Sequence, residues 1–409
     1  KLAELEKSGE AANTIVFFYS DHGGTVPRGK GYLYESGTHV PFIAYFPEKW
    51  KHLAAMPLPA VSDRLVSFVD FAPTVLNLAG VEIPGFMTGK PFFGKGSGKP
   101  GNQHRYIFTF RANQGNSFAP ARAITDGAYK LIWNYQSAYP NGTRQDYQWQ
   151  MPAQQAWDIA ERKGALDPLQ EKFWRPVETF ELYNIKTDSL ETRNLAGDKN
   201  YRRIFKRLKT ALQRTVREHN DLGFIPREYR KTLQEQDALY LLSQENKIGT
   251  DRQIRAAETA SLRKVSNLEV LTGYLSDSDP VIQYWGSSGI CGLAKTKLID
   301  TLPAEVAGIM EQQEIIPEVK CMLAEAMVYA GDREKGLNYL LTQLKEGFGP
   351  AAAALQNVGG KAMPLVNELR LLLSEPGKNR HKFYIRSTLI NCDALPYSAL
   401  YPINEKVTE

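Results

Sequence analysis

Residues 14–24 are Thr-Ile-Val-Phe-Phe-Tyr-Ser-Asp-His-Gly-Gly, and this stretch decides the predicted fold. Its first six residues are β-branched or aromatic, which is typical of a strand buried on both faces of a helix-covered sheet. Ligands bind beyond the carboxyl ends of strands in open α/β sheets, where Asp21 and His22 stand. Gly23 and Gly24 let the backbone bend sharply there. A carboxylate beside an imidazole suits a metal or acid/base site, but also an Asp that caps a turn beside an ordinary loop His.

The neighbouring residues extend this α/β prediction. Residues 2–9 have the pattern of an amphipathic helix end, and the apolar run 40–46 predicts a second strand. A helix is expected over residues 63–78, started by Ser62 or Asp63 and stopped by Gly80. Alternating strand and helix indicate an α/β layer architecture. Residues 84–101 are rich in Gly, Pro and Lys, which predicts a long surface loop.

A second unit has the pattern of a small antiparallel sheet covered by a helix. Strand-like segments are followed by a basic helix near residues 201–219. Between Tyr201 and Lys231 there are ten Lys or Arg against three acidic residues. This local excess fits either a solvated helix face or a surface that attracts a polyanion such as a sulfated glycan. The strand-like segments are residues 106–110, 123–125, 130–133 and 180–183.

From about Thr232 onward the chain has helical periodicity. Two segments that begin at Asp279 and Ile316 repeat with an offset of 37 residues, and each places Pro at the first helical position. This resembles a short HEAT-like α-solenoid, and an irregular helical bundle is the alternative. Because solenoids present extended surfaces, the helical domain could bind substrate, contact another protein or subunit, or only support the rest of the fold. Further helices are predicted over residues 334–345, 350–358, 362–373 and 382–391.

Composition excludes several classes of protein. A formal net charge of +5 is too small to imply nucleic-acid binding, and 43% hydrophobic with 23% charged residues is ordinary for globular chains. No apolar run reaches the length of a membrane span, so no transmembrane segment is expected. Cys291, Cys321 and Cys392 lie in helical patterns, and their odd number argues for core packing over a disulfide framework.

A resemblance to a known family comes from residues 30–41, which are Lys-Gly-Tyr-Leu-Tyr-Glu-Ser-Gly-Thr-His-Val-Pro. Together with the preceding Asp-His-Gly, this stretch resembles the formylglycine-dependent sulfatases of the alkaline-phosphatase superfamily. Their pattern is a buried strand ending in Ser-Asp-(Asn or His)-Gly, a lysine, and then Tyr-Glu-x-Gly-x-x-x-Pro. The match continues through residues 69–80, 122–132 and 181–195, so it extends over roughly the first 220 residues.

The resemblance implies roles for individual residues. Asp21 and His22 would be two ligands of a divalent cation, usually Ca²⁺, for which the Asp21 oxygen is the better match. Lys30 would be the catalytic residue that contacts the sulfate group, because an ammonium stabilises the negative charge that develops as the S–O bond breaks. His39 and Arg111 are candidate substrate-binding residues, with a structural or exposed position as the alternative.

The resemblance also implies an activity. We expect a sulfuric ester hydrolase that acts on a sulfated carbohydrate with Ca²⁺ in a periplasmic or secreted setting. Residues 26–34 are similar to those of N-sulfoglucosamine sulfohydrolases, which makes an N-sulfate a candidate bond. The alternatives are a phosphodiesterase or phosphonate hydrolase of the same superfamily and a non-catalytic glycan- or protein-binding protein.

The chain also departs from the family pattern. Sulfatases carry a Cys or Ser in a Cys/Ser-x-Pro/Ala-x-Arg motif that becomes the formylglycine nucleophile, and none of the three cysteines has this context. The chain starts at Lys1 without a signal-like segment. We therefore expect a C-terminal portion of a sulfatase that is inactive alone, with formylglycine upstream. Its expected parts are the C-terminal part of the α/β core (1–95), an α+β subdomain with the antiparallel sheet (96–225) and an all-α HEAT-like repeat domain (226–409).

Overall fold

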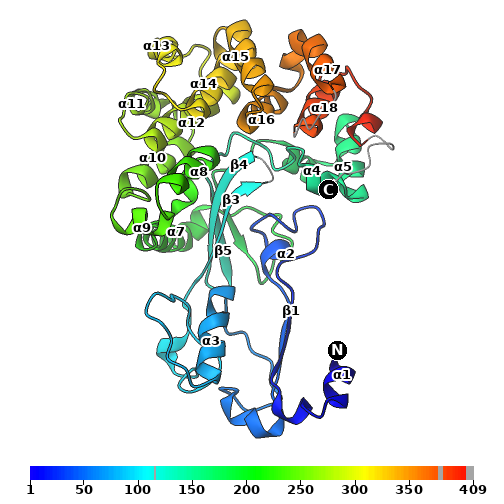
Figure 1. The fold of residues 1–409 in the computed structure, drawn as a ribbon, viewed down its shortest axis with the longest axis vertical. Coiled ribbons are helices and arrows are strands. Elements are labelled where there is room, and N and C mark those ends of the chain that lie inside the picture. The colour runs from blue at the N-terminus through cyan, green and yellow to red at the C-terminus, as the bar shows by residue number, and fades with distance from the viewer. Residues whose placement is uncertain (115–116, 376–380, 402–409) are drawn as a thin grey trace.

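The computed structural model describes residues 1–114, 117–375 and 381–401. The N-terminal part, the four-stranded sheet and the larger group of helices follow one another along the longest axis of the molecule (Figure 1). The N-terminal part contains α1 (Leu2–Lys7) and an antiparallel ribbon of β1 (Val16–Tyr19) and β2 (Phe42–Tyr45), with the short α2 (Glu35–Thr38) between the strands. The predicted helix and both strands are therefore confirmed, although each strand is shorter than its apolar run.

One face of this ribbon forms an aromatic cluster with α3 (Phe71–Leu78). The rings of Phe17 and Phe42 pack edge-on at 5.6 Å, and both pack against Phe71. The other face is exposed, because Phe18 and Ile43 retain 64% and 60% of their accessible surface. The expectation that β1 is buried on both faces is wrong for the described chain. Apolar residues show that a strand is suited to burial, but not which element covers it.

The helix predicted from Ser62 or Asp63 begins later. A 3₁₀ turn over Phe68–Asp70 leads into α3, and Ser67 and Asp70 form a capping box. The buried Asp70 carboxylate also accepts a hydrogen bond from the Lys90 backbone at 2.8 Å. The capping box at Ser67 and Asp70 starts the helix, and the contact with Lys90 fixes the Asp70 carboxylate, so the N-cap signals at 62–63 were misleading. The predicted stop at Gly80 is confirmed by its positive φ of 70°.

The second unit is a four-stranded antiparallel sheet, as predicted, in the order β3-β4-β5-β6. Residues Leu208 and Leu212 of α7 (Arg202–Glu218) are fully buried, and the helix packs on β4 and β5. The alternation of side chains along β5 directs Lys130 to the sheet face opposite α7. The strands are β3 (Ile107–Gln114), β4 (Ser117–Thr125), β5 (Tyr129–Asn134) and β6 (Phe180–Asn184). Three short helices between β5 and β6 were not predicted: α4 (Asp146–Trp149), α5 (Pro152–Arg162) and α6 (Pro168–Glu171).

The rest of the described chain is helical, as predicted. The two repeated segments form α12 (Pro280–Lys295) and α14 (Pro317–Ala330), each with Pro in its first turn. Helix α14 packs on α12 and on α16 (Gly349–Val358), which packs on α18 (Lys382–Asn391), so these helices form one row (Figure 1). The other helices are α8 (Arg227–Gln236), α9 (Leu239–Gln244), α10 (Asp251–Ser261), α11 (Leu268–Tyr274), α13 (Glu305–Glu311), α15 (Arg333–Lys345) and α17 (Val366–Ser374). A row of packed helices is compatible with a HEAT-like array. The HEAT-like repeat itself stays a prediction.

The sheet and the helical row share one hydrophobic core. The indole of Trp285 in α12 donates a hydrogen bond to the Phe224 carbonyl at 2.9 Å, and Trp133 in β5 donates to the Ser261 hydroxyl at 2.9 Å. The three cysteines are free thiols buried in the helical part, as expected. None of the described helices is long and apolar enough to cross a membrane.

Candidate functional site

Four of the five predicted site residues, Asp21, His22, Lys30 and His39, lie in the segment that joins β1 to β2. The Ser20 hydroxyl donates to the carbonyl of His22 at 2.6 Å, and the Gly23 amide donates to the Gly37 carbonyl at 3.0 Å. A Cβ at Gly23 would lie 1.7 Å from a backbone oxygen, so only glycine fits there. The Lys30 amide donates to the Gly24 carbonyl at 2.9 Å. The loop thus folds back on itself and holds Asp21, His22 and Lys30 in one hydrogen-bonded unit.

The ring of His22 is oriented by its neighbours. Its Nδ1 lies 2.7 Å from the carbonyl oxygen of Gly23. A carbonyl only accepts, so Nδ1 must carry a proton. Its Nε2 lies 3.3 Å from Oδ2 of Asp21. In neutral imidazole two lone pairs would face each other across this gap, which is favourable only when a proton or a metal cation lies between them.

This donor set fits one part of a calcium site. Asp21, whose side chain is 81% exposed, supplies a carboxylate oxygen, and His22 supplies a ring nitrogen. Ca²⁺ takes six to eight ligands, mostly oxygens. No group of three or more His, Cys, Asp or Glu that could hold a metal occurs among the described residues. In the described part of the chain, Asp21 and His22 would therefore be two ligands of a larger set.

Lys30 is positioned by its backbone and its side chain. Its carbonyl accepts a hydrogen bond from the Gln148 amide at 3.0 Å, and Nζ lies 4.8 Å from the centroid of the Tyr147 ring. Within the described residues no carboxylate forms an ion pair with this ammonium, whose charge is therefore available to an anion. Lys30 borders a small cavity with Tyr32 and Gln154.

His39 lies at the end of the same segment, after α2, and Arg111 lies in a different element. His39 is 76% exposed, pairs with Glu35 across 2.9 Å, and borders a cavity of about 510 Å³ between the ribbon and the sheet. Arg111 lies in β3 and borders a third cavity. Its guanidinium donates to the carbonyls of Ala119 at 2.9 Å and Gly31 at 3.3 Å, and burial lowers its pKa. The structure thus places Lys30, His39 and Arg111 beside three different cavities.

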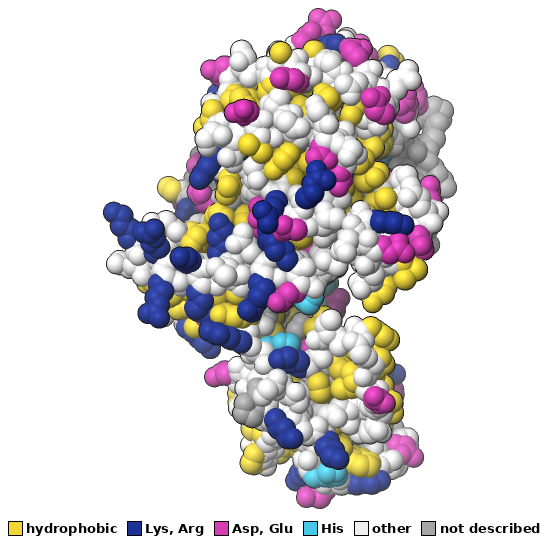
Figure 2. Space-filling view, turned by 90° about the vertical axis from the view of Figure 1, so that its left-hand side faces the viewer, with side chains coloured by type: hydrophobic (Ala, Val, Ile, Leu, Met, Phe, Trp, Pro, Cys, Tyr) yellow, Lys and Arg dark blue, Asp and Glu magenta, His cyan; other side chains and the backbone are white. Residues whose placement is uncertain are grey.

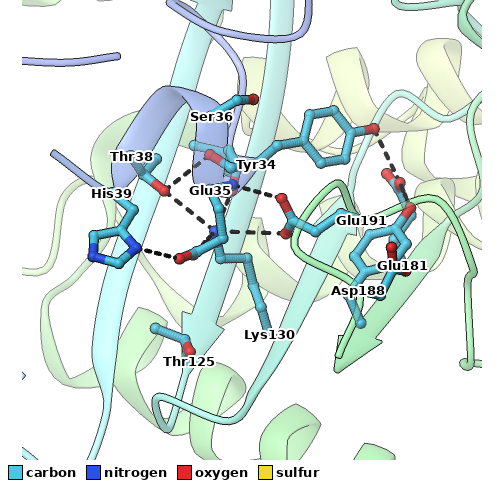
Figure 3. Close-up of polar contacts among 12 residues, drawn as sticks. Tyr34, Glu35, Ser36, Thr38, His39, Thr125, Lys130, Glu181, Asp188 and Glu191 are labelled. Atoms are coloured by element: carbon cyan, nitrogen blue, oxygen red, sulfur yellow. Dashed lines mark hydrogen bonds and ion pairs between the residues drawn. The ribbon is translucent and has the colours of Figure 1, made fainter. Parts of the chain in front are cut away.

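A buried ionic cluster that the sequence prediction missed connects the loop to the sheet (Figure 3). Nζ of Lys130, which is 2% exposed, lies 2.5 Å from Oε1 of Glu35 and 3.6 Å from Oε1 of Glu191. It also donates to the carbonyl of Leu33 at 3.0 Å and to the Thr38 hydroxyl at 3.2 Å. Figure 3 shows the Lys130 side chain between Glu35 and Glu191, which come from separate segments.

Glu191 completes the cluster. Its Oε2 accepts a hydrogen bond from the Glu35 amide at 2.5 Å, and its backbone has a positive φ of 51°. Burial, partly offset by Lys130, raises the pKa of Glu191 to about 7. Both glutamates belong to motifs that carry the family resemblance, Tyr-Glu-x-Gly and Glu-Thr. That resemblance was the one signal that could have located them, and it assigned them no role.

Part of the chain is similar to known proteins. The family model described as Sulfatase matches residues 2–81. The chain is 33% identical over 226 residues to an ulvan-active sulfatase of Formosa agariphila, a match that covers 55% of this chain and 36% of that protein. It is 27% identical over 241 residues to the N-sulphoglucosamine sulphohydrolase of Homo sapiens, with 54% and 45% of the two chains covered. The chain thus spans less than half of the length of these two relatives.

Among solved structures, a putative sulfatase from Bacteroides thetaiotaomicron aligns with a TM-score of 0.39 and 21% identity, over 56% of this chain and 40% of that one. The matched segment 2–81 contains β1, the strand-end pair Asp21 and His22, and Lys30. The matches to the two sequence relatives are longer than this segment, at 226 and 241 residues. Residues 2–81 thus match the Sulfatase family model, and the two sequence relatives named above are sulfatases.

Proposed function

We propose that this chain supplies metal- and sulfate-binding residues of a sulfuric ester hydrolase that acts on sulfated carbohydrates. The observation that carries the proposal is the loop after β1. There the Asp21–His22 pair and Lys30, whose ammonium forms no ion pair with a carboxylate of the described residues, belong to one hydrogen-bonded unit inside the sulfatase-matching segment. The names of the relatives, an ulvan-active sulfatase and an N-sulphoglucosamine sulphohydrolase, support a sulfated glycan as substrate and an N-sulfate as one candidate bond.

The proposed chemistry divides between the cation and the chain. Bound Ca²⁺ would polarise the sulfate group, with Asp21 and His22 as two of its ligands. Lys30 would donate hydrogen bonds to a sulfate oxygen and stabilise the negative charge on the leaving oxygen. The Lys130 cluster would hold the loop in place, because a site on a loop needs a rigid support to keep its geometry.

The nucleophile is not one of the cysteines in this chain. None of them lies in a Cys-x-Pro-x-Arg context, and burial raises the pKa values of the Cys291, Cys321 and Cys392 thiols. A buried thiol with a raised pKa is a poor nucleophile. We propose that a formylglycine outside these 409 residues serves this purpose, and that the parent protein acts in the periplasm or outside the cell.

The test uses the parent protein that contains this chain, produced together with a formylglycine-generating enzyme. Sulfate release from ulvan and from N-sulfated glycans is measured with and without Ca²⁺. Asp21→Ala and Lys30→Ala should each abolish calcium-dependent release, while the exposed control changes Asp300→Ala and Lys95→Ala should not. Release of phosphate in place of sulfate would favour a phosphodiesterase. Glycan binding without turnover would favour a non-catalytic protein.

A further inference from the structure

The amino-terminal end of α7 carries four exposed cations: Lys199, Arg202, Arg203 and Lys206. We call these four residues the α7 basic surface. Lys199 is three or four residues from Arg202 and Arg203, and each arginine is three or four residues from Lys206, so the Cβ atoms of these pairs lie roughly 5–6 Å apart on a helix. No carboxylate pairs with any of the four within the described chain. Figure 2 shows Lys and Arg side chains gathered across the middle of the face that includes this helix.

Two other cations of the same helix are each paired with carboxylates of neighbouring elements. Arg207 lies 2.6 Å from Asp126, and the carboxylates of Asp251 and Glu258 lie 2.7 and 2.9 Å from Arg217. Paired arginines of this kind connect α7 to neighbouring elements. The four residues of the α7 basic surface have no such structural use, so the fold does not explain their charge.

Their position also opposes local stability. The first turn of α7 contains no acidic residue, although the positive end of the helix dipole favours Asp or Glu there. Like charges three or four residues apart repel each other by a few tenths of a kcal/mol per pair. Cations kept where both the dipole and their neighbours disfavour them are typical of a surface that binds an anion.

From this arrangement we propose that the α7 basic surface binds a sulfated polysaccharide chain. The assignment of a sulfated glycan rests on the proposed function. Guanidinium groups of Arg202 and Arg203 can each donate two parallel hydrogen bonds to an oxyanion. Surfaces for single-stranded nucleic acid combine cations with exposed aromatic rings. Here the ring of Tyr201 packs against Tyr129 at 6.1 Å.

The α7 basic surface lies on one side of the four-stranded sheet. Helix α7 packs on β4 and β5, whereas Lys130 of β5 reaches the loop with Lys30 on the opposite side. A long polymer could contact both sides of the sheet, but a monosaccharide sulfate could not. The α7 basic surface should therefore affect the binding of polymers and leave small substrates unaffected.

The test is heparin binding by the whole 409-residue chain. The triple change Arg202→Glu, Arg203→Glu and Lys206→Glu is compared with Lys7→Glu, Lys297→Glu and Lys345→Glu, three exposed cations on other elements. Both variants change the net charge equally. Acidic residues in the first turns of α7 complement its dipole, so the first variant should fold and keep its melting temperature. Its Kd for heparin should rise about 10-fold or more at low salt, and the parent chain's affinity should fall steeply with added salt.

Equal losses in the two triple variants would overturn the proposal, because net charge alone would then explain binding. Tighter binding of duplex DNA than of heparin at equal salt would overturn the sulfated-glycan assignment. The proposed function is tested separately in the parent protein, where the α7 triple change should leave sulfate release from a monosaccharide sulfate unchanged. A parent that releases no sulfate, while heparin binding still depends on the α7 basic surface, would refute only the proposed catalytic function.

Discussion

The ammonium of Lys130 lies 2.5 Å from the carboxylate of Glu35, and Lys130 itself is 2% exposed. This ion pair joins the sheet to the loop that carries the proposed site. Glu35 begins α2, only five residues after Lys30, so the pair holds the loop close to its functional end. Its loss should therefore affect both the stability of the fold and the geometry of the loop.

Lys130→Met should destabilise the chain strongly. Removing the cation leaves the buried carboxyl group of Glu191 and the 18% exposed carboxylate of Glu35 without Lys130, and breaking a buried pair costs about 3–5 kcal/mol. Urea unfolding at pH 7.5 measures the effect. Lys186→Met, at an exposed lysine, serves as the control and should change the midpoint little. Equal midpoints for the two variants would contradict a structural role for Lys130.

Glu191 should make stability depend on pH. Its carboxyl titrates near 4.5 when unfolded and near 7 when folded, because burial disfavours the charged form. Between pH 4.5 and 7 the folded state binds more protons at Glu191 than the unfolded state does. The contribution of Glu191 to the free energy of unfolding is therefore fully present below about pH 4.5 and is lost as the pH rises through 7. The change is on the order of 3 kcal/mol. The free energy of unfolding is measured at pH 5 and at pH 8 in the parent chain and in Glu191→Gln. The difference between the two pH values should be smaller in the variant. If it is unchanged, another group causes the pH dependence.

Gly223→Ala should destabilise the chain by about 1–3 kcal/mol. A Cβ at this position would lie 2.1 Å from Nη2 of Arg122. That arginine is held in place by its ion pair with Asp221, in which Arg122 Nη2 lies 2.8 Å from Asp221 Oδ1. Gly273→Ala in α11 is the matched control, because no atom lies within 4 Å of its added Cβ. That change should stabilise the helix by roughly 0.5–1 kcal/mol. Melting temperatures that move in the same direction would show that Arg122 adjusts to the added methyl group.

Arg144→Met should loosen the helical row from the sheet unit. Arg144 pairs with Asp158 across 2.6 Å and donates to Asn391 of α18 at 2.6 Å. Limited proteolysis should cut the variant faster near α18 than the parent chain. Arg162→Met is the control, because its partner Asp393 is 85% exposed and surface pairs contribute little. Equal cleavage rates in both variants would show that other core contacts suffice to hold α18.

Local patterns in the sequence were enough to predict many elements of the fold, although not α4, α5 and α6, and the place of the candidate loop. The apolar run ending at Tyr19, the two glycines after His22 and the prolines that start α12 and α14 depend only on neighbouring residues. Side-chain periodicity and backbone freedom act over a few residues, so they can be recognised without the tertiary structure.

The tertiary structure decided which residues contact each other. The Asp70 carboxylate at the start of α3 contacts the backbone of Lys90, twenty residues away. Lys130 of β5 pairs with Glu35 and Glu191, which lie on two other segments of the chain. It also decided that Phe18 is exposed and that Arg111 contacts backbone carbonyls. Burial and charge pairing depend on which distant segments meet, and no local pattern contains that information.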